Sequence, residues 1–280
     1  MIKRKRSISR TNQDKPILDH ILEIKAEHPL WGYRRIWAYL RYRERIIIGK
    51  NRIYRLLKEK SLLIKPNDRL KAKRYSTRPK PRANKPNQFW GIDMTKIKIN
   101  NFGWLYLHVV LDWYTKEIVG YSLSLQSKTK DWQLALEKAV NKRFPEGIKE
   151  AEHDIALISD NGCQPTSENF MKACNILNIK QIFTTWNNPK GNADTERVMR
   201  TIKEDLIWPR DFDNPFELEK ALNVWIKDYN EDFPHQSLKY KTPVEFYQDY
   251  LKLNFETHLN QKNTDSIFNL ILNKKEVLTY

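Results

Sequence analysis

The spacing of apolar residues changes along the chain, and the change separates two kinds of structure. Over residues 17–64, apolar residues recur mostly at three- and four-residue steps, which predicts amphipathic helices. Residues 28–32 and Gly49 interrupt this pattern, so a short three-helix unit is expected there. From Phe89 onward, apolar residues at every second position predict strands.

The second segment predicts an α/β fold with a five-stranded mixed sheet flanked by helices. Strands are expected at residues 89–99, 104–112, 118–125, 155–159 and 180–183. Helices are expected at residues 131–144, 167–177, 192–207, 215–229 and 243–253. The short connections between the first three strands require antiparallel neighbours, whereas the last two strands are reached through helical crossovers.

Between these segments the composition favours neither helix nor core. Residues 65–88 contain nine Lys and Arg, four Pro and one acid. Proline disfavours helix and like charges disfavour collapse, so an extended linker that binds backbone phosphates is predicted. The predicted organisation is a basic helical unit at 1–65, a linker at 66–88, a catalytic body with C-terminal helices at 89–255, and a tail at 256–280 without a motif.

The net charge of +16 is distributed unevenly. Residues 1–88 contain 26 Lys and Arg against 7 acids, a net of +19, which leaves 24 against 27, a net of −3, for the remainder. This asymmetry indicates an arm that binds a polyanion, attached to a nearly neutral body. A ribosomal or architectural protein would show the same bias, because charge indicates a partner and not a reaction.

Basic side chains on the helical unit are candidates for DNA contacts. Arg34, Arg35, Arg52 and Arg55 lie on this unit, which resembles a helix-turn-helix. The alternative is a solvated basic face on a small bundle.

The composition also excludes some classes of protein. There is no apolar stretch of the length that a membrane helix needs, and the basic start runs into polar residues, so no signal peptide is predicted. Two cysteines, Cys163 and Cys174, and scattered histidines form no zinc pattern and suit a reducing compartment. A cytoplasmic protein is therefore expected.

Three acids occupy positions that suit a site at a sheet edge. Asp93 lies within the first strand, Asp160 directly follows the fourth, and Glu196 lies on the helix after the fifth. Ligands bind at the carboxyl ends of strands in such sheets. Carboxylate oxygens hold Mg²⁺, and two such ions would activate a water or a 3′-hydroxyl for displacement at phosphorus. Singly, Asp160 would be an ordinary turn residue and Glu196 a surface acid.

The helix that carries Glu196 has further polar residues on the same face. Lys203 follows Glu196 by seven residues, while Asn192 and Arg200 lie four residues to either side of it. Such a row suits a metal-binding acid beside groups that hold DNA. The alternative is an ordinary solvated helix face.

Several segments together resemble the OrfB-type transposases of bacterial insertion sequences, a branch of the DDE transposase and retroviral integrase superfamily. The interval between Asp160 and Glu196 contains 35 residues, the spacing of the D,D-35-E group. The body contains WGIDMT, LDWYTKEIVGYS, SDNGCQPTS and NPKGNADTERVMRTIKEDL, and the N-terminal unit contains WGYRRI and KNRIYRLLKEKSL. YNEDFPHQSLKYKTPVEFY resembles the C-terminal signature of the family.

The resemblance implies an RNase H-like fold and metal-dependent DNA cleavage and strand transfer. It implies that Asp93, Asp160 and Glu196 hold Mg²⁺, with Mn²⁺ as a substitute, and that Lys203 contacts DNA near the reacting end. It also implies an OrfA-type partner or an OrfA–OrfB fusion, a homo-oligomer on DNA, and a place at the bacterial nucleoid.

Two positions depart from the usual sequence pattern of this family. Phe233 stands where the family usually has Arg before Pro-His, and Glu117 stands where it often has Lys. His235 is interpreted as structural.

Three other classes of protein are alternatives to a transposase. An inactive DNA-binding regulator would have no reason to keep all three acids. A retroviral integrase would need a zinc unit before the core, and a ribonuclease H would leave the basic unit and the C-terminal signature unexplained.

Overall fold

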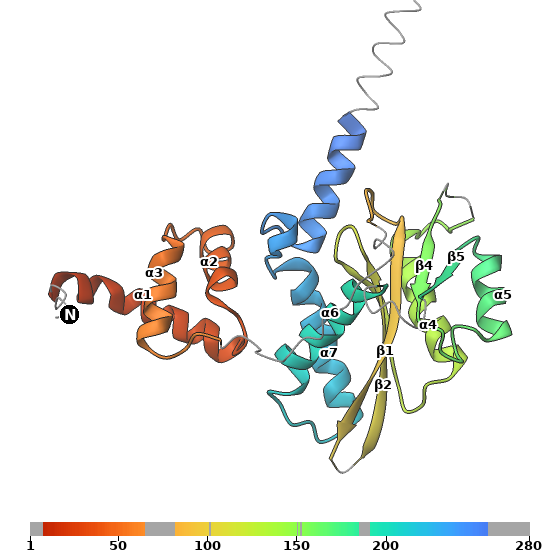
Figure 1. The fold of residues 1–280 in the computed structure, drawn as a ribbon, viewed down its shortest axis with the longest axis horizontal. Coiled ribbons are helices and arrows are strands. Elements are labelled where there is room, and N and C mark those ends of the chain that lie inside the picture. Colours follow the sequence, from red (N-terminus) through yellow and green to blue (C-terminus); the bar gives the residue numbers. More distant parts are fainter. Residues whose placement is uncertain are drawn as a thin grey trace, which may run out of the picture.

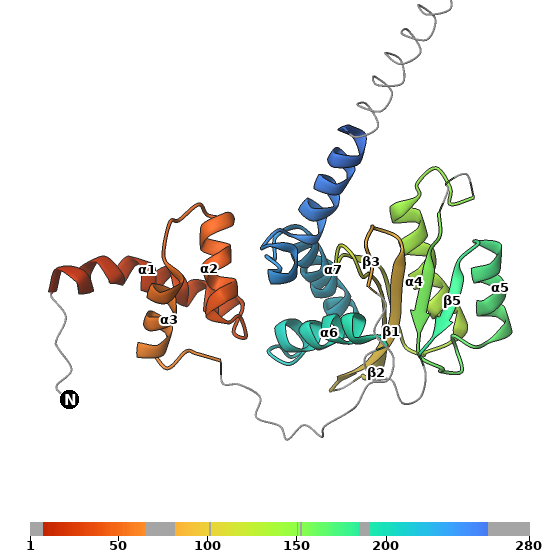
Figure 2. The same cartoon turned by 45° about the horizontal axis from the view of Figure 1, so that its top comes forward.

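The chain consists of a helical N-terminal unit and a layered α/β body (Figures 1 and 2). The computed structural model describes residues 8–64, 82–100, 102–149, 151, 153–184 and 191–256. Most of the predicted linker, residues 66–81, and nearly all of the predicted tail, residues 257–280, lie outside the described ranges. Within those ranges, no helix combines the length and apolar character needed to cross a membrane.

The N-terminal unit contains the three helices that the apolar spacing predicts. They are α1 (Ile8–Glu27), α2 (Tyr33–Tyr42) and α3 (Lys50–Glu59). Gly32 and Gly49 have extended backbone directly before α2 and α3, where the pattern predicts interruptions. Helix α1 starts before the predicted residue 17 and continues through Pro16, although proline removes one backbone hydrogen bond from a helix interior.

The body is built on the predicted mixed sheet. Its strands are β1 (Phe89–Ile99), β2 (Gly103–Asp112), β3 (Ile118–Ser124), β4 (Ala156–Ser159) and β5 (Lys180–Phe183). Their order across the sheet is β3-β2-β1-β4-β5. The first three strands pair antiparallel, and β4 and β5 run parallel to β1. The prediction of strand pairing from connection length is confirmed.

Helices cover both faces of this sheet. They are α4 (Thr129–Arg143), α5 (Glu168–Ile176), α6 (Ala193–Ile202) and α7 (Pro215–Glu231), followed by the short 3₁₀ helix η2 (Gln236–Leu238) and a helical stretch at residues 243–256. The single helix predicted at residues 192–207 is divided, because α6 continues as a π-helical turn, η1 (Lys203–Ile207). Turns of this kind are rare and occur frequently at functional sites.

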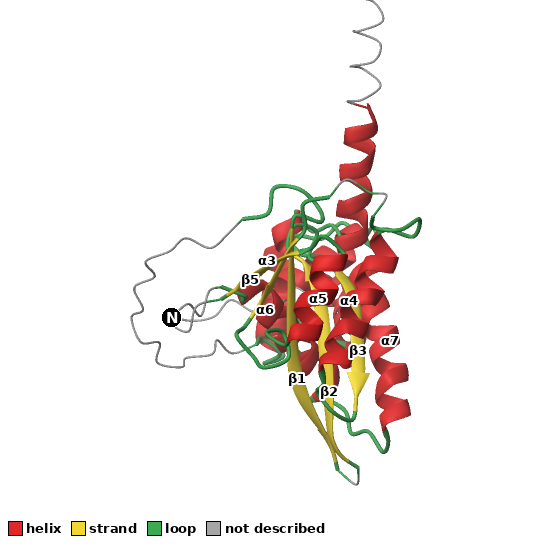
Figure 3. Ribbon diagram, turned by 90° about the vertical axis from the view of Figure 1, so that its right-hand side faces the viewer, coloured by secondary structure: helices red, strands yellow, loops and turns green. Residues whose placement is uncertain are grey.

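The alternation of side chains along the strands divides the core between the two faces. Trp90 and Ile92 pack in one cluster with Trp132 of α4 and Phe170 of α5. Ile97 belongs to the other cluster, which includes apolar residues of α6, α7 and the N-terminal unit. Figure 3 shows the helices on either side of the strands. Helix α6, which carries Glu196, is therefore positioned by the apolar face of β1 that Ile97 occupies.

Ion pairs join the N-terminal unit to the body. The Arg43 guanidinium bonds to both carboxylate oxygens of Glu245, with Nη2 2.9 Å from Oε2. Arg35 Nη1 lies 3.6 Å from Asp205 Oδ2 on η1. The buried carboxyl of Asp205 has a pKa raised from its ordinary value, chiefly by loss of solvent, and Arg35 opposes this change.

Candidate active site

The first acid, Asp93, lies in the middle of the sheet. It is opposite Val109 of β2, and its Oδ1 accepts a hydrogen bond from the Met94 backbone N–H at 2.8 Å. Because side chains alternate along a strand, Asp93 lies on the same face as Ile97, the face that α6 covers. An acid inside a strand is disfavoured, and this position beneath α6 fits the predicted functional role.

The second acid, Asp160, is brought beside Asp93 by strand register. Strand β4 runs parallel to β1 and pairs Ile158 with Gly91. Asp160 and Asp93 each follow this pair by two residues, so both carboxyl groups leave the same face of neighbouring strands, which are about 4.8 Å apart in a sheet. The Gly162 backbone N–H donates to Asp160 Oδ1 at 3.1 Å, as the predicted turn requires.

The third acid, Glu196, is held in place by an unusually close approach of α6 to β1. A Cβ atom on Gly91 would lie 2.0 Å from Thr195 Oγ1 and 2.7 Å from Asn192 Oδ1, so only glycine fits. Trp113 Nε1–H donates to Thr195 Oγ1 at 3.2 Å. The Glu196 backbone N–H donates to the Asn192 carbonyl at 3.0 Å, which ties Glu196 to this first helical turn.

The three acids interact electrostatically. The pKa of Asp93 is raised to about 6, first by burial and then by the negative charges of Asp160 and Glu196. The Met94 backbone N–H and the positive charge of Lys203 act in the opposite direction. Asp160, Glu196 and Lys203 therefore all lie within electrostatic range of the Asp93 carboxyl group.

The donor chemistry of these acids fits a hard divalent cation, since all three would offer carboxylate oxygens. The negative charges of Asp160 and Glu196 contribute to the raised pKa of Asp93 after burial, and a bound cation would offset them. As the side chains stand, the described ranges contain no group of three His, Cys, Asp or Glu residues close enough together to form a metal site. The acids would have to move closer together to share a cation.

The residues predicted to hold DNA beside Glu196 differ in their surroundings. The Asn192 side chain is only 6% exposed and its Nδ2 donates to the Ile92 carbonyl at 3.2 Å, so it supports the helix from inside the protein. Arg200 is largely exposed and its Nε bonds to Glu204 at 2.6 Å. Lys203 has no ion-pair partner among the described residues, and it lines a hollow beside β1.

The four arginines predicted on the N-terminal unit also have different surroundings. Arg52 and Arg55 both bond to the Asp14 carboxylate, at 2.7 and 2.9 Å. Arg35 lies against the body beside Asp205. Arg34 is the most open of them; it bonds to the Tyr33 hydroxyl at 3.1 Å and has no acidic partner among the described residues. Arg34 thus remains the most accessible candidate for a phosphate contact.

Two side chains after β2 support the structure. Glu117 is buried and pairs with Arg143 at 2.6 Å and Lys142 at 2.7 Å. Its departure from the family pattern therefore supports the packing of α4 against the sheet. Lys116 Nζ lies 3.0 Å from Asp194 Oδ2 on the first turn of α6.

The support of α6 by Gly91, Trp113 and Thr195 was not predicted from the sequence. The signal was present, because a glycine inside a strand pattern often marks the close approach of another backbone. His235, interpreted as structural, is half-buried with its ring centroid 4.8 Å from that of Tyr229, and loss of solvent lowers its pKa to about 3.

Parts of the chain match known protein families, and most of its length is similar to known proteins. Two families described as integrase core domains match residues 83–189 and 177–243, and an HTH-like domain family matches residues 12–69. The chain is similar to Transposase InsD for insertion element IS2A/D/F/H/I/K of Escherichia coli, with 24% identity over 243 residues that cover 85% of this chain and 80% of that protein. Transposase InsD for insertion element IS2-9 of strain K12 has the same identity and coverage of this chain, with 78% of that protein covered.

Among solved structures, this chain is similar to a chain of the simian T-cell lymphotropic virus intasome in complex with PP2A regulatory subunit B56 gamma. The TM-score is 0.51 at 21% identity, covering 71% of this chain and 67% of that chain. At this identity the likeness concerns the fold alone. The predicted RNase H-like body and the helix-turn-helix-like unit before it are confirmed.

Proposed function

We propose that the chain, which matches integrase core families and is similar to transposases of insertion sequences, cuts and joins DNA strands at Asp93, Asp160 and Glu196. The observation that carries the proposal is the register of β1 and β4, which places Asp93 and Asp160 on the same face of neighbouring strands, the face against which α6 packs closely at Gly91. Three acids from β1, the end of β4 and α6 thus act on one another within a fold of the appropriate kind.

We propose Mg²⁺ as the cofactor, with Mn²⁺ as a substitute. When bound, such ions would lower the pKa of an attacking water or 3′-hydroxyl and would stabilise the leaving oxygen. Asp93 and Asp160 would hold them from the sheet, and Glu196 from α6. The tight contact with Gly91 holds the backbone of α6 in place, so a rotation of the Glu196 side chain would bring its carboxylate toward the other two acids.

Lys203 and the basic N-terminal unit would hold the DNA. Lys203 lies on the same helix as Glu196 and acts on the Asp93 carboxyl, so a phosphate beside the acids would lie close to it. Residues 1–88 carry the whole excess of positive charge, which suits contacts that are not specific for sequence. We propose that Arg34 contributes there, and that Arg200 contributes after release from Glu204.

The proposal extends to assembly and location. The intasome named above and the insertion-element transposases suggest a homo-oligomer on DNA, at the nucleoid in the bacterial cytoplasm. The OrfB resemblance suggests an OrfA-type partner or a fusion with it, which would contribute to recognition of the element ends.

The test is strand cleavage and joining with Mg²⁺ on DNA that carries the terminal repeats flanking the gene. Glu196→Gln, Asp93→Asn and Asp160→Asn should each reduce the rate by more than about 10³-fold, as expected when a group that acts as part of a unit is removed. Glu168→Gln, which alters an exposed acid at the start of α5, serves as the matched control and should retain activity. Equal activity in wild type and Glu196→Gln would overturn the assignment of Glu196 to the active site. An inactive wild type would favour the alternative function, a DNA-binding regulator without catalytic activity.

A further inference from the structure

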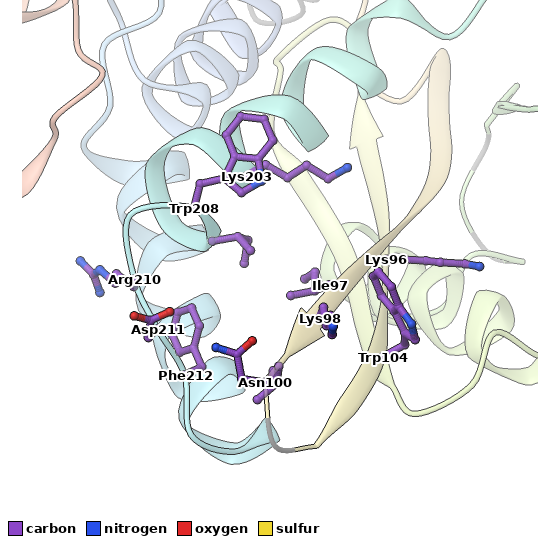
Figure 4. Close-up of a pocket in the computed structure, with 12 residues that line it drawn as sticks. Lys96, Ile97, Lys98, Asn100, Trp104, Lys203, Trp208, Arg210, Asp211 and Phe212 are labelled. Atoms are coloured by element: carbon purple, nitrogen blue, oxygen red, sulfur yellow. The ribbon is translucent and has the colours of Figure 1, made fainter.

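A hollow of about 370 Å³ lies between η1 and the hairpin of β1 and β2 (Figure 4). This volume is within the range of small-ligand sites, about 300–1,000 Å³. One wall is formed by η1 and the segment after it, including Lys203, Trp208 and Arg210. The opposite wall is formed by the hairpin, including Lys98 and Trp104.

The hollow lies at an open edge of β1. Its lining includes both Ile97 and Lys98, which are consecutive and therefore point to opposite faces of the strand. The β2 side of β1 is paired over residues 90–99, whereas β4 pairs with β1 only over Phe89–Gly91. Past Gly91, no described strand pairs with the β4 side of β1. The hollow is therefore open along β1 and forms a groove that is accessible to an extended ligand.

The charge of the residues that line the groove favours the binding of an anion. Lys96, Lys98, Lys203 and Arg210 contribute four positive charges, and Asp211 contributes the single negative charge. Among the described residues, none of the four cations forms an ion pair. A strongly positive groove with unneutralised cations is typical of sites that bind a phosphate backbone.

Two exposed indoles accompany these cations. Trp208 is 65% exposed and Trp104 is 53% exposed, whereas the other six described tryptophans are at most 9% exposed. Neither exposed ring stacks on another aromatic ring within the described ranges. An indole that stays in solvent beside cations offers a flat apolar face on which a nucleobase can stack.

The groove begins beside the acids. Lys203 lines it and also acts on the Asp93 carboxyl, and Figure 4 shows this side chain extending from the helix toward β1. Ile97, which also lines the hollow, follows Asp93 by four residues on the same face of β1, or about 13 Å along the strand. A DNA strand whose phosphate is attacked at the acids could therefore continue along the groove.

We propose that this groove binds an unpaired stretch of the DNA strand next to the attacked phosphate, with one base stacked on Trp208 and the backbone on Lys98, Lys203 and Arg210. This inference rests on the proposed function for the identity of the strand. A paired duplex would not present the face of a base to Trp208, because its bases stack on one another. The groove therefore selects DNA that has been opened at the reacting end.

The experiment compares the binding of two fluorescein-labelled probes to the full chain, single-stranded dT12 and a 12-base-pair duplex. Anisotropy is measured at raised ionic strength, which weakens the contribution of the basic N-terminal region more than stacking. Trp208→Ala should weaken dT12 binding by about 10- to 100-fold, the cost of losing one stacking platform. Trp208→Phe should restore most of that loss, and duplex binding should change less than about twofold in both variants.

Phe216→Ala is the matched control, since Phe216 is 81% exposed but does not line the groove. Unchanged dT12 binding by Trp208→Ala would overturn the proposal, as would an equal loss for duplex and single strand. Trp208 is exposed, so the variant should fold, and an unchanged melting temperature would verify this.

Glu196→Gln separates this inference from the proposed function. It should bind dT12 as wild type does, because stacking does not require catalysis. If Glu196→Gln retained cleavage while Trp208→Ala lost dT12 binding, the active-site assignment would be wrong, and the proposal that the groove binds single-stranded DNA would be supported. If Glu196→Gln lost cleavage and Trp208→Ala bound dT12 normally, only the groove would fail.

Discussion

The ring of Phe233 meets the indole of Trp31 edge-on, with centroids 4.9 Å apart and planes at 90°. Trp31 belongs to the segment before α2 and Phe233 to the segment after α7, so this contact joins the N-terminal unit to the body. His28 stacks on Trp31 with centroids 3.9 Å apart and also meets Phe233 edge-on, with centroids 5.1 Å apart. Phe233 replaces the arginine expected in the family, and here the position contributes to packing between two parts of the chain.

Phe233→Ala should lower the free energy of unfolding by about 3–5 kcal/mol, because it removes a ring that is only 2% exposed. Phe216→Ala is the matched control and should change stability by no more than about 0.5 kcal/mol, since Phe216 is 81% exposed. Urea unfolding of both variants is the measurement. Equal effects of the two substitutions would show that the Trp31 contact does not stabilise the chain.

The ion pair of Arg43 with Glu245 should contribute measurably to the same junction. Its geometry is bidentate and the Arg43 side chain is largely buried, so a double-mutant cycle with alanine should give a coupling energy of about 1 kcal/mol. The exposed pair of Arg200 and Glu204 on one helix should give about 0.3–0.5 kcal/mol. A smaller coupling for Arg43 than for Arg200 would contradict this view of the junction.

The elements of the body were largely predictable from the sequence. The bounds of β1 agree with the alternation of apolar residues, because a strand whose inward positions are buried imposes that pattern strongly. The bounds of β5, an edge strand that is only partly buried, also match the predicted residues. The placement of Asp93, Asp160 and Glu196 followed from these elements. Local spacing therefore accounts for the fold and for the candidate acids.

Tertiary partners were not predictable in the same way. Arg43 and Glu245 are 202 residues apart, and no local pattern indicates that they meet. Arg52 and Arg55 resembled free cations in the sequence, but they share the Asp14 carboxylate on α1. A charged side chain has the same sequence signature whether it faces solvent, DNA or another side chain, so only the folded arrangement separates these roles.

Gly91→Ala should impair both stability and catalysis, because the added methyl group would be forced against Thr195 and Trp113. Overpacking of this kind costs about 1–3 kcal/mol, and relief by outward movement of α6 would carry Glu196 away from Asp93. We expect strand cleavage to fall by at least about 10²-fold, the effect of misplacing a reacting group by about 1 Å.

The control for this substitution is Gly49→Ala, since no atom lies within 4 Å of a Cβ at that position. It alters the residue before α3 and should cost no more than about 1 kcal/mol, with cleavage retained. Full cleavage activity in Gly91→Ala, measured on the element ends, would show that the close approach of α6 is not required for the site.

The buried imidazole of His108 should make stability depend on pH. It is fully buried between Ser122 and Ser127, 3.1 Å from each hydroxyl, and burial lowers its pKa to about 4. The unfolded chain, in which the pKa is about 6.5, therefore binds more protons between pH 4 and 6.5. The contribution of neutral His108 is complete above pH 6.5 and is lost as the pH falls toward 4, by up to about 3 kcal/mol.

His108→Gln tests this prediction, because glutamine can bond to a hydroxyl and does not titrate. The free energy of unfolding should decrease less steeply for the variant than for wild type between pH 7 and pH 4.5, whatever the offset at neutral pH. Asp93 acts with the opposite sign, since its raised pKa makes stability fall as the pH rises from about 4 to about 6. That effect is common to both proteins and cancels in their difference, so parallel curves would contradict the role of His108.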